Sequence, residues 1–242
     1  MDAPSTPNRM EKIVLKFYFN GAPNPLKVAL MLEETGLGYD AIALDTKTGD
    51  QHTPQYRTIN PNGKAPSIVD GEVTVFDSNA ILLYLAEKTG QFLPEDTAQN
   101  RGALLSWMMF VASGIGPFSG QAVHFRHFAP GENAYAKGRY AFEARRHWQV
   151  VEDRLAKNRY MLGDTYTIVD MSVWGWATRI PFMLGDEAMA EYPSLGRLMD
   201  EINARPAAVR ALGLAARHSF KQAFDDDAMR NLYPHIHASR TS

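Results

Sequence analysis

Two adjacent polar residues, Asp77 and Ser78, stand where a predicted strand passes into a predicted helix. Short polar side chains at a helix start cap free backbone amides whatever the function. The same place can also bind a ligand, because free amides attract a carboxylate and a nearby carboxylate attracts an ammonium group. A ligand that ends in a free amino acid carries an ammonium group and a carboxylate on the same carbon. On the residues alone, capping and ligand binding both remain open here.

The chain of 242 residues contains no cysteine. Disulfide bridges, thiolate metal sites and a thiol nucleophile of the protein are therefore excluded. Any thiol chemistry must use a thiol that the ligand carries, and lowering its pKa from about 8.5 by about two units requires about 2.7 kcal/mol. Tyr18 and Tyr56 offer hydroxyl groups, but Tyr18 lies within a predicted strand and nothing places either beside a ligand sulfur.

Two pairs of histidines, His124 with His127 and His235 with His237, are close in sequence. No acidic or thiolate ligand joins either pair at metal-site spacing, so we expect no metal. The phenylalanines interleaved with the first pair either pack or line a co-substrate pocket. The glycine-rich stretch 114–120 has the wrong spacing for a nucleotide loop and no preceding strand, so its small residues are better explained by close helix packing.

The composition is that of an ordinary globular protein, with 45% apolar and 21% charged residues and a formal net charge of -2. There is no cluster of positive charge for a phosphate backbone or an anionic membrane, so nucleic acid is not an expected partner. The longest apolar run, residues 81–86, is too short to span a bilayer, and the first residues lack the apolar stretch of a secretory signal. We therefore expect no membrane partner and a cytoplasmic location.

The first part of the chain predicts a small mixed sheet covered by helices. After a loose leader at 1–12, a strand is expected at 13–19 and a helix from Pro25, with Asn24 as its N-cap and Gly36 as its stop. A second strand at 39–44 precedes a polar stretch, 45–60, with a short or poorly formed helix. Two strands at 67–69 and 73–76 form a hairpin, and a helix follows at 79–88. This order resembles a thioredoxin fold over residues 13–90.

The second part predicts only helices. A linker at 91–100 precedes an all-helical domain at 101–215, and a polar tail at 216–242 either wraps around the protein or remains mobile. The strongest local signal is Thr167 with Asp170, a capping box in which each side chain bonds a backbone amide of the same helix start. Such a box contributes about 1 kcal/mol and fixes where a buried helix begins.

Three separated motifs carry a family resemblance: NPNGKAP at 60–66, FDSNAILLYLA at 76–86 and YTIVD at 166–170. With them the sequence resembles the cytosolic glutathione transferases over residues 13–215. GPFSGQ at 116–121, together with the residues from His124 to Tyr140, resembles the bacterial nu class of glutathione-dependent disulfide reductases. The resemblance implies an α/β thioredoxin-like domain followed by an all-α domain, glutathione as co-substrate in reduced or oxidised form, and a homodimer.

The resemblance also assigns roles to residues. Asp77 and Ser78 become the clamp for the γ-glutamyl group. Ala65 presents its backbone to the cysteinyl part because Pro66 is held cis, although sequence alone favours a trans bond. Lys64 becomes a partner for the glycyl carboxylate. The glutamine that corresponds to Gln51 belongs to the same site in the nu class.

Asn24 is the candidate catalytic residue. Nu-class relatives carry Thr-Pro-Asn after the first strand, and Ala22-Pro23-Asn24 stands there in this chain, so the hydroxyl is missing and the amide is retained. Arg139 would be a surface arginine on the residues alone. The resemblance implies that it crosses the dimer interface to a glutathione carboxylate.

Three functions agree with these residues. The first is reduction of small disulfides with two glutathione molecules, with transferase or peroxidase side activity. The second is conjugation of glutathione to a carbon electrophile, or cleavage of an ether. The third is a glutathione-binding scaffold without turnover, which Ala22 in place of a hydroxyl suggests.

Overall fold

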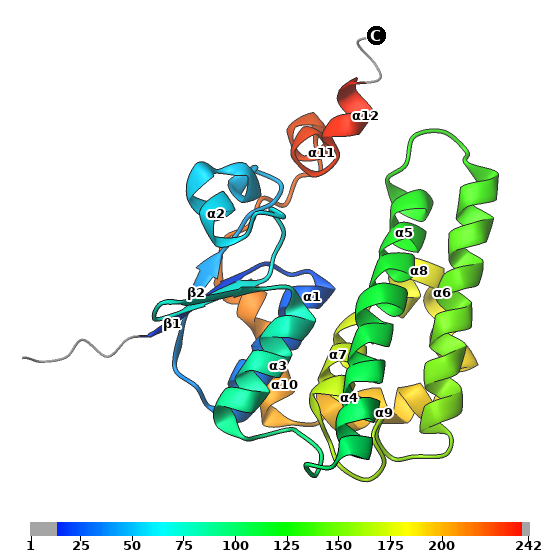
Figure 1. Ribbon diagram of the computed structural model, residues 1–242. Helices are drawn as coiled ribbons and strands as arrows, with labels where there is room; N and C mark the ends of the chain where they lie inside the picture. The colour runs from blue at the N-terminus through cyan, green and yellow to red at the C-terminus, as the bar shows by residue number, and fades with distance from the viewer. Residues whose placement is uncertain (1–13, 239–242) are drawn as a thin grey trace, which may run out of the picture.

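The computed structural model describes residues 14–238 and divides them into a sheet-containing part and a helical part (Figure 1). The sheet has the order β2-β1-β3-β4. Its strands are β1 (Leu15–Phe19), β2 (Tyr39–Ala43), β3 (Ser67–Asp70) and β4 (Val73–Phe76). β1 pairs parallel with β2 and antiparallel with β3, and β3 pairs antiparallel with β4. The crossover and the hairpin predicted from the sequence produce this mixed sheet.

Helices cover both faces of the sheet (Figure 1). α1 (Pro23–Thr35) and α3 (Ser78–Thr89) lie on one face, and each ends at a glycine, Gly36 or Gly90, in the left-handed conformation. The polar stretch after β2 forms a 3₁₀ turn, η1 (Asp50–His52), and the short helix α2 (Pro54–Ile59) on the other face. The predicted leader, 1–12, lies outside the described residues.

The first helix begins earlier than we predicted. α1 starts at Pro23 with Ala22 as N-cap, so Asn24 is its second residue and does not cap it. The amide of Leu26 bonds the carbonyl of Ala22, which closes the first turn at this point. Prolines are tolerated in a first turn because the amides that they lack have no intrahelical partner there. The Asn24 side chain is therefore free for other contacts.

The second part of the chain consists of helices, as predicted, apart from an isolated bridge between Tyr160 and Gly163. The first of these helices begins inside the segment expected as linker. The elements are α4 (Ala98–Phe110), the π-helical turn η2 (Val111–Ile115), α5 (Gly116–His127), α6 (Ala134–Leu155), α7 (Ile168–Ala177), α8 (Ile180–Leu184), η3 (Asp186–Glu191), α9 (Pro193–Asn203) and α10 (Pro206–Leu214).

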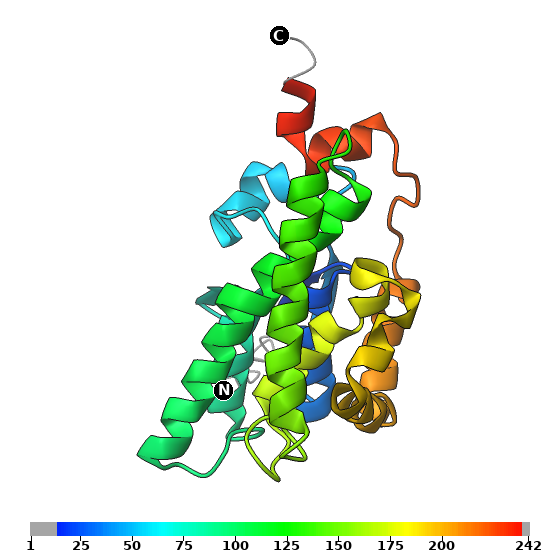
Figure 2. The same ribbon diagram turned by 90° about the vertical axis from the view of Figure 1, so that its right-hand side faces the viewer.

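α4, η2 and α5 form one continuous helix, Ala98–His127 (Figure 2). This helix of 30 residues is long and apolar enough to cross a membrane, by length and composition alone. Polar residues interrupt it, so it does not stand out in the sequence as an unbroken apolar run. In the structure this helix packs against α6 and α7, and 33% of its most apolar stretch is buried. The expectation of no membrane partner stays a prediction.

α7 connects the two parts of the protein. All ten of its residues are buried, and it packs against α1 and α3 of the sheet domain. The predicted capping box is confirmed: the Thr167 hydroxyl accepts from the amide of Val169, and the Asp170 carboxylate accepts from the amide of Thr167. α10 also packs on α1, so the C-terminal half of the chain encloses this helix.

The tail wraps around the sheet domain. After the turn η4 (Ala215–Arg217), the chain runs to two short helices, α11 (Asp226–Leu232) and α12 (Pro234–Ala238), beside α2 (Figure 1). Lys47 donates to the carbonyl of Gln222, and the amide of Lys221 donates to Asp45. The described part of the tail is thereby bound to the loop between β2 and α2.

Candidate functional site

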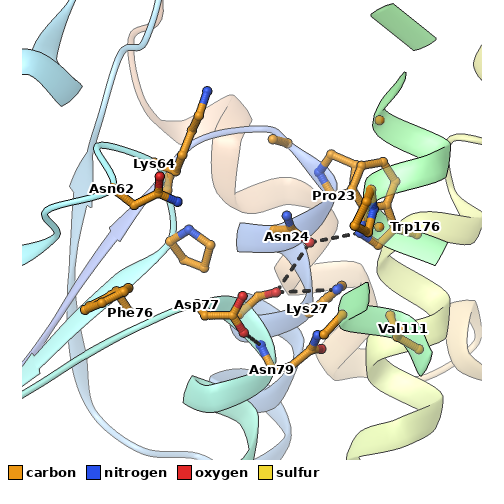
Figure 3. Close-up of a pocket in the computed structure, with 18 of the residues that line it drawn as sticks. Pro23, Asn24, Lys27, Asn62, Lys64, Phe76, Asp77, Asn79, Val111 and Trp176 are labelled. Atoms are coloured by element: carbon orange, nitrogen blue, oxygen red, sulfur yellow. Dashed lines mark hydrogen bonds between the residues drawn. The ribbon is translucent and has the colours of Figure 1, made fainter. Parts of the chain in front are cut away.

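A cleft of about 870 Å³ lies between the two parts of the chain (Figure 3). One wall comes from the sheet domain: the start of α1, the loop before β3, and the junction of β4 with α3. The opposite wall comes from η2, α5 and Trp176 of α7, and the tail adds Tyr233 and His235. Its size is within the range of small-molecule sites in proteins, and it brings together most of the residues that the sequence indicated.

Asp77 and Ser78 meet in this cleft as predicted. Asp77, labelled in Figure 3, is the N-cap of α3. Its Oδ1 accepts hydrogen bonds from the amides of Asn79 at 2.9 Å and Ala80 at 3.2 Å. Its φ of 71° is unusual for a residue other than glycine and carries roughly 1–3 kcal/mol of strain. Asp77 therefore caps α3. Because Asp77 is also exposed at the cleft, its carboxylate is available to the ammonium group of a ligand.

Ser78 is buried and connects two polar residues of α1. Its hydroxyl accepts from Lys27 Nζ at 3.4 Å and donates to Asn24 Oδ1 at 3.3 Å (Figure 3). Asn24 Oδ1 also accepts from Trp176 Nε1 at 2.9 Å. Burial lowers the pKa of Lys27 to about 7, and the charge of Asp77 partly opposes this change.

The peptide bond between Ala65 and Pro66 is cis, as the resemblance implied, and both residues line the cleft together with Lys64. The carbonyl of Lys64 accepts hydrogen bonds from Tyr56 Oη and Asn60 Nδ2, each at 2.6 Å. Tyr56 therefore holds the loop before β3 in place through the backbone carbonyl of Lys64. Neither Tyr56 nor Tyr18 lines the cleft, so the structure does not bring either hydroxyl to the place of a ligand sulfur.

Gln51 does not line the cleft. Its side chain is buried, and Nε2 donates to the carbonyls of Thr46 and Asn231, each at 3.1 Å. The tail residue Asn231 also donates from its side chain to the carbonyl of Lys47. Gln51 Oε1 is buried without a hydrogen-bond partner. The tail thus holds the Gln51 side chain at a buried position outside the lining of the cleft.

Arg139 is also not brought to the cleft within one chain. It is exposed on α6, and its Nη1 lies 2.6 Å from Glu143 Oε1, one helical turn away. Tyr135 and Phe142, on the same face of this helix, leave 85% and 61% of their surface exposed. This face of α6 has no partner among residues 14–238 that would cover it.

Sequence reasoning assigned no role to Lys27 and Trp176, although both line the cleft. Lys27 could have been found, because it interrupts the apolar face of the first helix and lies three residues after Asn24. Trp176 gives no such signal, since it lies 152 residues from Asn24 in the sequence.

Four aromatic residues of α5 and the tail line one side of the cleft and are called the aromatic wall: His124, Phe125, Tyr233 and His235. The His124 ring lies 4.8 Å from that of Tyr233 and 6.3 Å from that of His235. Burial and the neighbouring His235 lower the pKa of His124. His124 and Phe125 line the pocket, whereas His127 and Phe128 pack on other rings, so each of the two alternatives holds for half of this group. Within residues 14–238 no group of three or more acidic or histidine side chains could hold a metal ion, and the absence of a metal stays a prediction.

Comparison with known proteins agrees with the two-part fold. Residues 14–87 match the family of glutathione S-transferase N-terminal domains, and residues 123–210 match that of C-terminal domains. The chain is 40% identical over 206 residues to the disulfide-bond oxidoreductase YfcG of Escherichia coli, covering 82% of this chain and 94% of that one.

Two solved structures are similar along nearly their whole length. A glutathione transferase family member from Pseudomonas fluorescens, with two glutathione bound, superposes with a TM-score of 0.79 at 34% identity, covering 85% of this chain and 95% of the other. A glutathione transferase from Pseudomonas putida, with one glutathione disulfide bound per subunit, gives a TM-score of 0.78 at 32% identity, covering 85% and 93%.

Proposed function

Because the chain belongs to the glutathione S-transferase family, we propose that it reduces small disulfides with two molecules of glutathione. The observation that carries this proposal is the meeting of Asn24, the cis-Pro66 loop and the Asp77–Ser78 pair at one cleft in a chain without cysteine. All sulfur atoms of the exchange then come from ligands. The relatives that bind two glutathione molecules or the disulfide, and the one named a disulfide-bond oxidoreductase, support the same chemistry.

The contacts of the cleft suggest how glutathione lies in it. Its γ-glutamyl ammonium pairs with Asp77. The carboxylate of the same γ-glutamyl group accepts from the backbone amide of Ser78, because Asp77 already caps the amides of Asn79 and Ala80. The backbone of Ala65 pairs with the cysteinyl part in the manner of an added strand. Lys64, which is exposed at the rim, attracts the glycyl carboxylate. The thiol then lies toward the start of α1 and Asn24.

The reaction consists of two thiol–disulfide exchanges. The thiolate of the first glutathione attacks one sulfur of the substrate, a mixed disulfide forms, and the other substrate sulfur leaves as a thiolate that takes up a proton. The thiolate of the second glutathione then attacks the glutathione sulfur of the mixed disulfide. Glutathione disulfide forms, the second substrate thiol is released, and the two electrons gained by the substrate come from the two glutathione molecules.

We further propose that the protein acts as a homodimer in which Arg139 serves the site of the partner subunit. Tyr135 and Phe142, two exposed aromatic side chains on the face of α6 that carries Arg139, support this arrangement, because a partner subunit would remove their apolar surface from water. A two-fold axis would make both sites equivalent. Wild-type protein should then sediment as a dimer, and Arg139→Ala should weaken binding of glutathione disulfide. A fully active monomer would refute the shared site.

Three parallel assays test the proposed reaction. Hydroxyethyl disulfide, an aryl halide and an organic peroxide are each supplied with reduced glutathione, and glutathione binding is measured separately by calorimetry. We expect turnover to be fastest with the disulfide. Conjugation of the aryl halide without disulfide reduction would replace the proposal by a transferase. Binding without turnover on any of the three would indicate a scaffold.

A further inference from the structure

The side-chain amide of Asn24 has only one possible orientation in this structure. An indole N–H is a donor without acceptor capacity, so the atom of Asn24 that lies 2.9 Å from Trp176 Nε1 must be the oxygen. Ser78 Oγ donates to the same oxygen at 3.3 Å. The amide oxygen therefore has two donors. In the part of the chain that the structure describes, Asn24 Nδ2 has no hydrogen-bond partner and remains free at the cleft.

The Asn24 oxygen determines the direction of the bonds at Ser78. Because an amide oxygen only accepts, the single proton of Ser78 Oγ is directed to Asn24, and Oγ accepts from Lys27 Nζ at 3.4 Å. Lys27 is 1% exposed, which is rare for a lysine without a carboxylate in direct contact. The order of donation is thus Lys27 to Ser78 to Asn24, with Trp176 donating to Asn24 from the other domain (Figure 3).

Two glycines allow these donors to reach their places. A Cβ atom on Gly175 would lie 2.4 Å from Lys27 Cγ and 2.8 Å from the carbonyl oxygen of Pro23, so α7 can approach α1 this closely only with glycine there. A Cβ atom on Gly116 would lie 3.3 Å from Trp176 Nε1. The packing of α1, α5 and α7 therefore leaves the Lys27 stem and the Trp176 indole little freedom to move.

We propose that Lys27 and Trp176 are positioning residues, which hold the amide of Asn24 with its nitrogen directed to the sulfur of bound glutathione. The proposal rests on the proposed function, in which that sulfur reacts as a thiolate. The orientation decides the sign of the effect. An N–H directed at the sulfur favours the thiolate and lowers the thiol pKa, whereas a rotated amide would present its oxygen and disfavour the thiolate.

The test uses two matched tryptophans on the same helix. Trp176→Phe removes the N–H that bonds Asn24 and keeps most of the ring. Trp174→Phe makes the same change two residues away, where Nε1 donates at 2.9 Å to Asn203 of α9 and not to the cleft. The readouts are the pKa of glutathione bound to the full-length protein, measured from the ultraviolet absorbance of its thiolate, and kcat and KM with hydroxyethyl disulfide.

We expect Trp176→Phe to raise the pKa of the bound thiol and to lower kcat about tenfold, with little change in the KM for glutathione. A tenfold decrease corresponds to the loss of about one hydrogen bond to a charged group. Trp174→Phe should lose comparable stability and keep both values. Lys27→Met should shift the thiol pKa in the same direction as Trp176→Phe. Equal thiol pKa values in wild type and Trp176→Phe, or equal shifts in both tryptophan variants, would overturn the proposal.

These outcomes separate the inference from the proposed function. If wild-type protein binds glutathione and forms the thiolate, but Trp176→Phe does so equally well, only the positioning role fails. If wild-type protein binds glutathione with an unshifted thiol pKa, the positioning role also fails, because there is no stabilised thiolate for Asn24 to serve. Failure of disulfide turnover with a lowered thiol pKa in wild type would leave the positioning role intact and remove only the disulfide reductase function.

Discussion

The capping box at the start of α7 should contribute far more to stability than an ordinary helix cap. Asp170 is completely buried, and its carboxylate accepts from the amides of Met161 at 2.7 Å and Thr167 at 2.8 Å. Asp170→Ala leaves both buried amides without a partner. At about 1–3 kcal/mol for each orphaned group, the free energy of unfolding should fall by about 2–6 kcal/mol. That is a large part of the 5–15 kcal/mol typical of a folded protein.

Thr97→Ala is the matched control for this prediction. Thr97 caps α4 with a hydroxyl that accepts from the amide of Asn100 at 3.1 Å, but it is exposed to solvent, so its loss should cost only about 1 kcal/mol. Urea unfolding at one fixed protein concentration, followed by far-ultraviolet circular dichroism, measures both variants. Asp170→Asn keeps one acceptor oxygen and serves if the alanine variant does not accumulate. Equal losses for the Asp170 and Thr97 variants would refute the reasoning.

Three further predictions concern the cleft. Asp77→Asn preserves an N-cap but removes the charge, so glutathione affinity measured by calorimetry should fall about tenfold with unchanged stability; unchanged affinity would contradict the γ-glutamyl assignment. Burial lowers the pKa of Lys27 from 10.5 to about 7. Between these two pH values Lys27 is protonated in the unfolded chain but neutral in the folded protein, so the free energy of unfolding of the unliganded protein should increase as the pH rises, by up to about 5 kcal/mol. Lys27→Met should abolish this rise in urea midpoints, and an identical pH dependence in both proteins would disprove the burial effect. Ending the chain after Arg217 removes the tail contacts of Gln51 and part of the aromatic wall, so the KM for the disulfide should increase; an unchanged KM would show that the tail does not form part of the site.

Local chemistry explains why the sheet domain could be predicted in detail. Gly36 and Gly90 end their helices because glycine adopts the left-handed conformation without strain, and this preference is visible in the sequence. The capping box of Thr167 and Asp170 is equally local, since its bonds span three residues. The cis bond before Pro66 followed only from the family resemblance, because most bonds before proline are trans.

The start of α1 was predicted wrongly for a physical reason. Asn24 before Pro25 has the pattern of an N-cap, and local preference alone places the helix start there. In the folded protein the Asn24 side chain bonds Trp176 and Ser78, which compete with a capping role and are distant in sequence. Residues whose partners come from another domain cannot be placed by periodicity or capping rules. The same holds for Gln51, whose bond to Asn231 spans 180 residues.

The bond from Trp176 to Asn24 also has an evolutionary consequence. The asparagine at the site belongs to the sheet domain, and one of the two donors that orient its amide belongs to α7 of the helical domain. A recombination event that exchanged the helical half for that of a distant relative would preserve the sheet, the cis-Pro66 loop and the Asp77 cap but would remove the shorter of these two hydrogen bonds. Selection for turnover would then act on one position of α7 and on the start of α1 together, so substitutions at Trp176 and Asn24 are expected to be correlated among descendants of this chain.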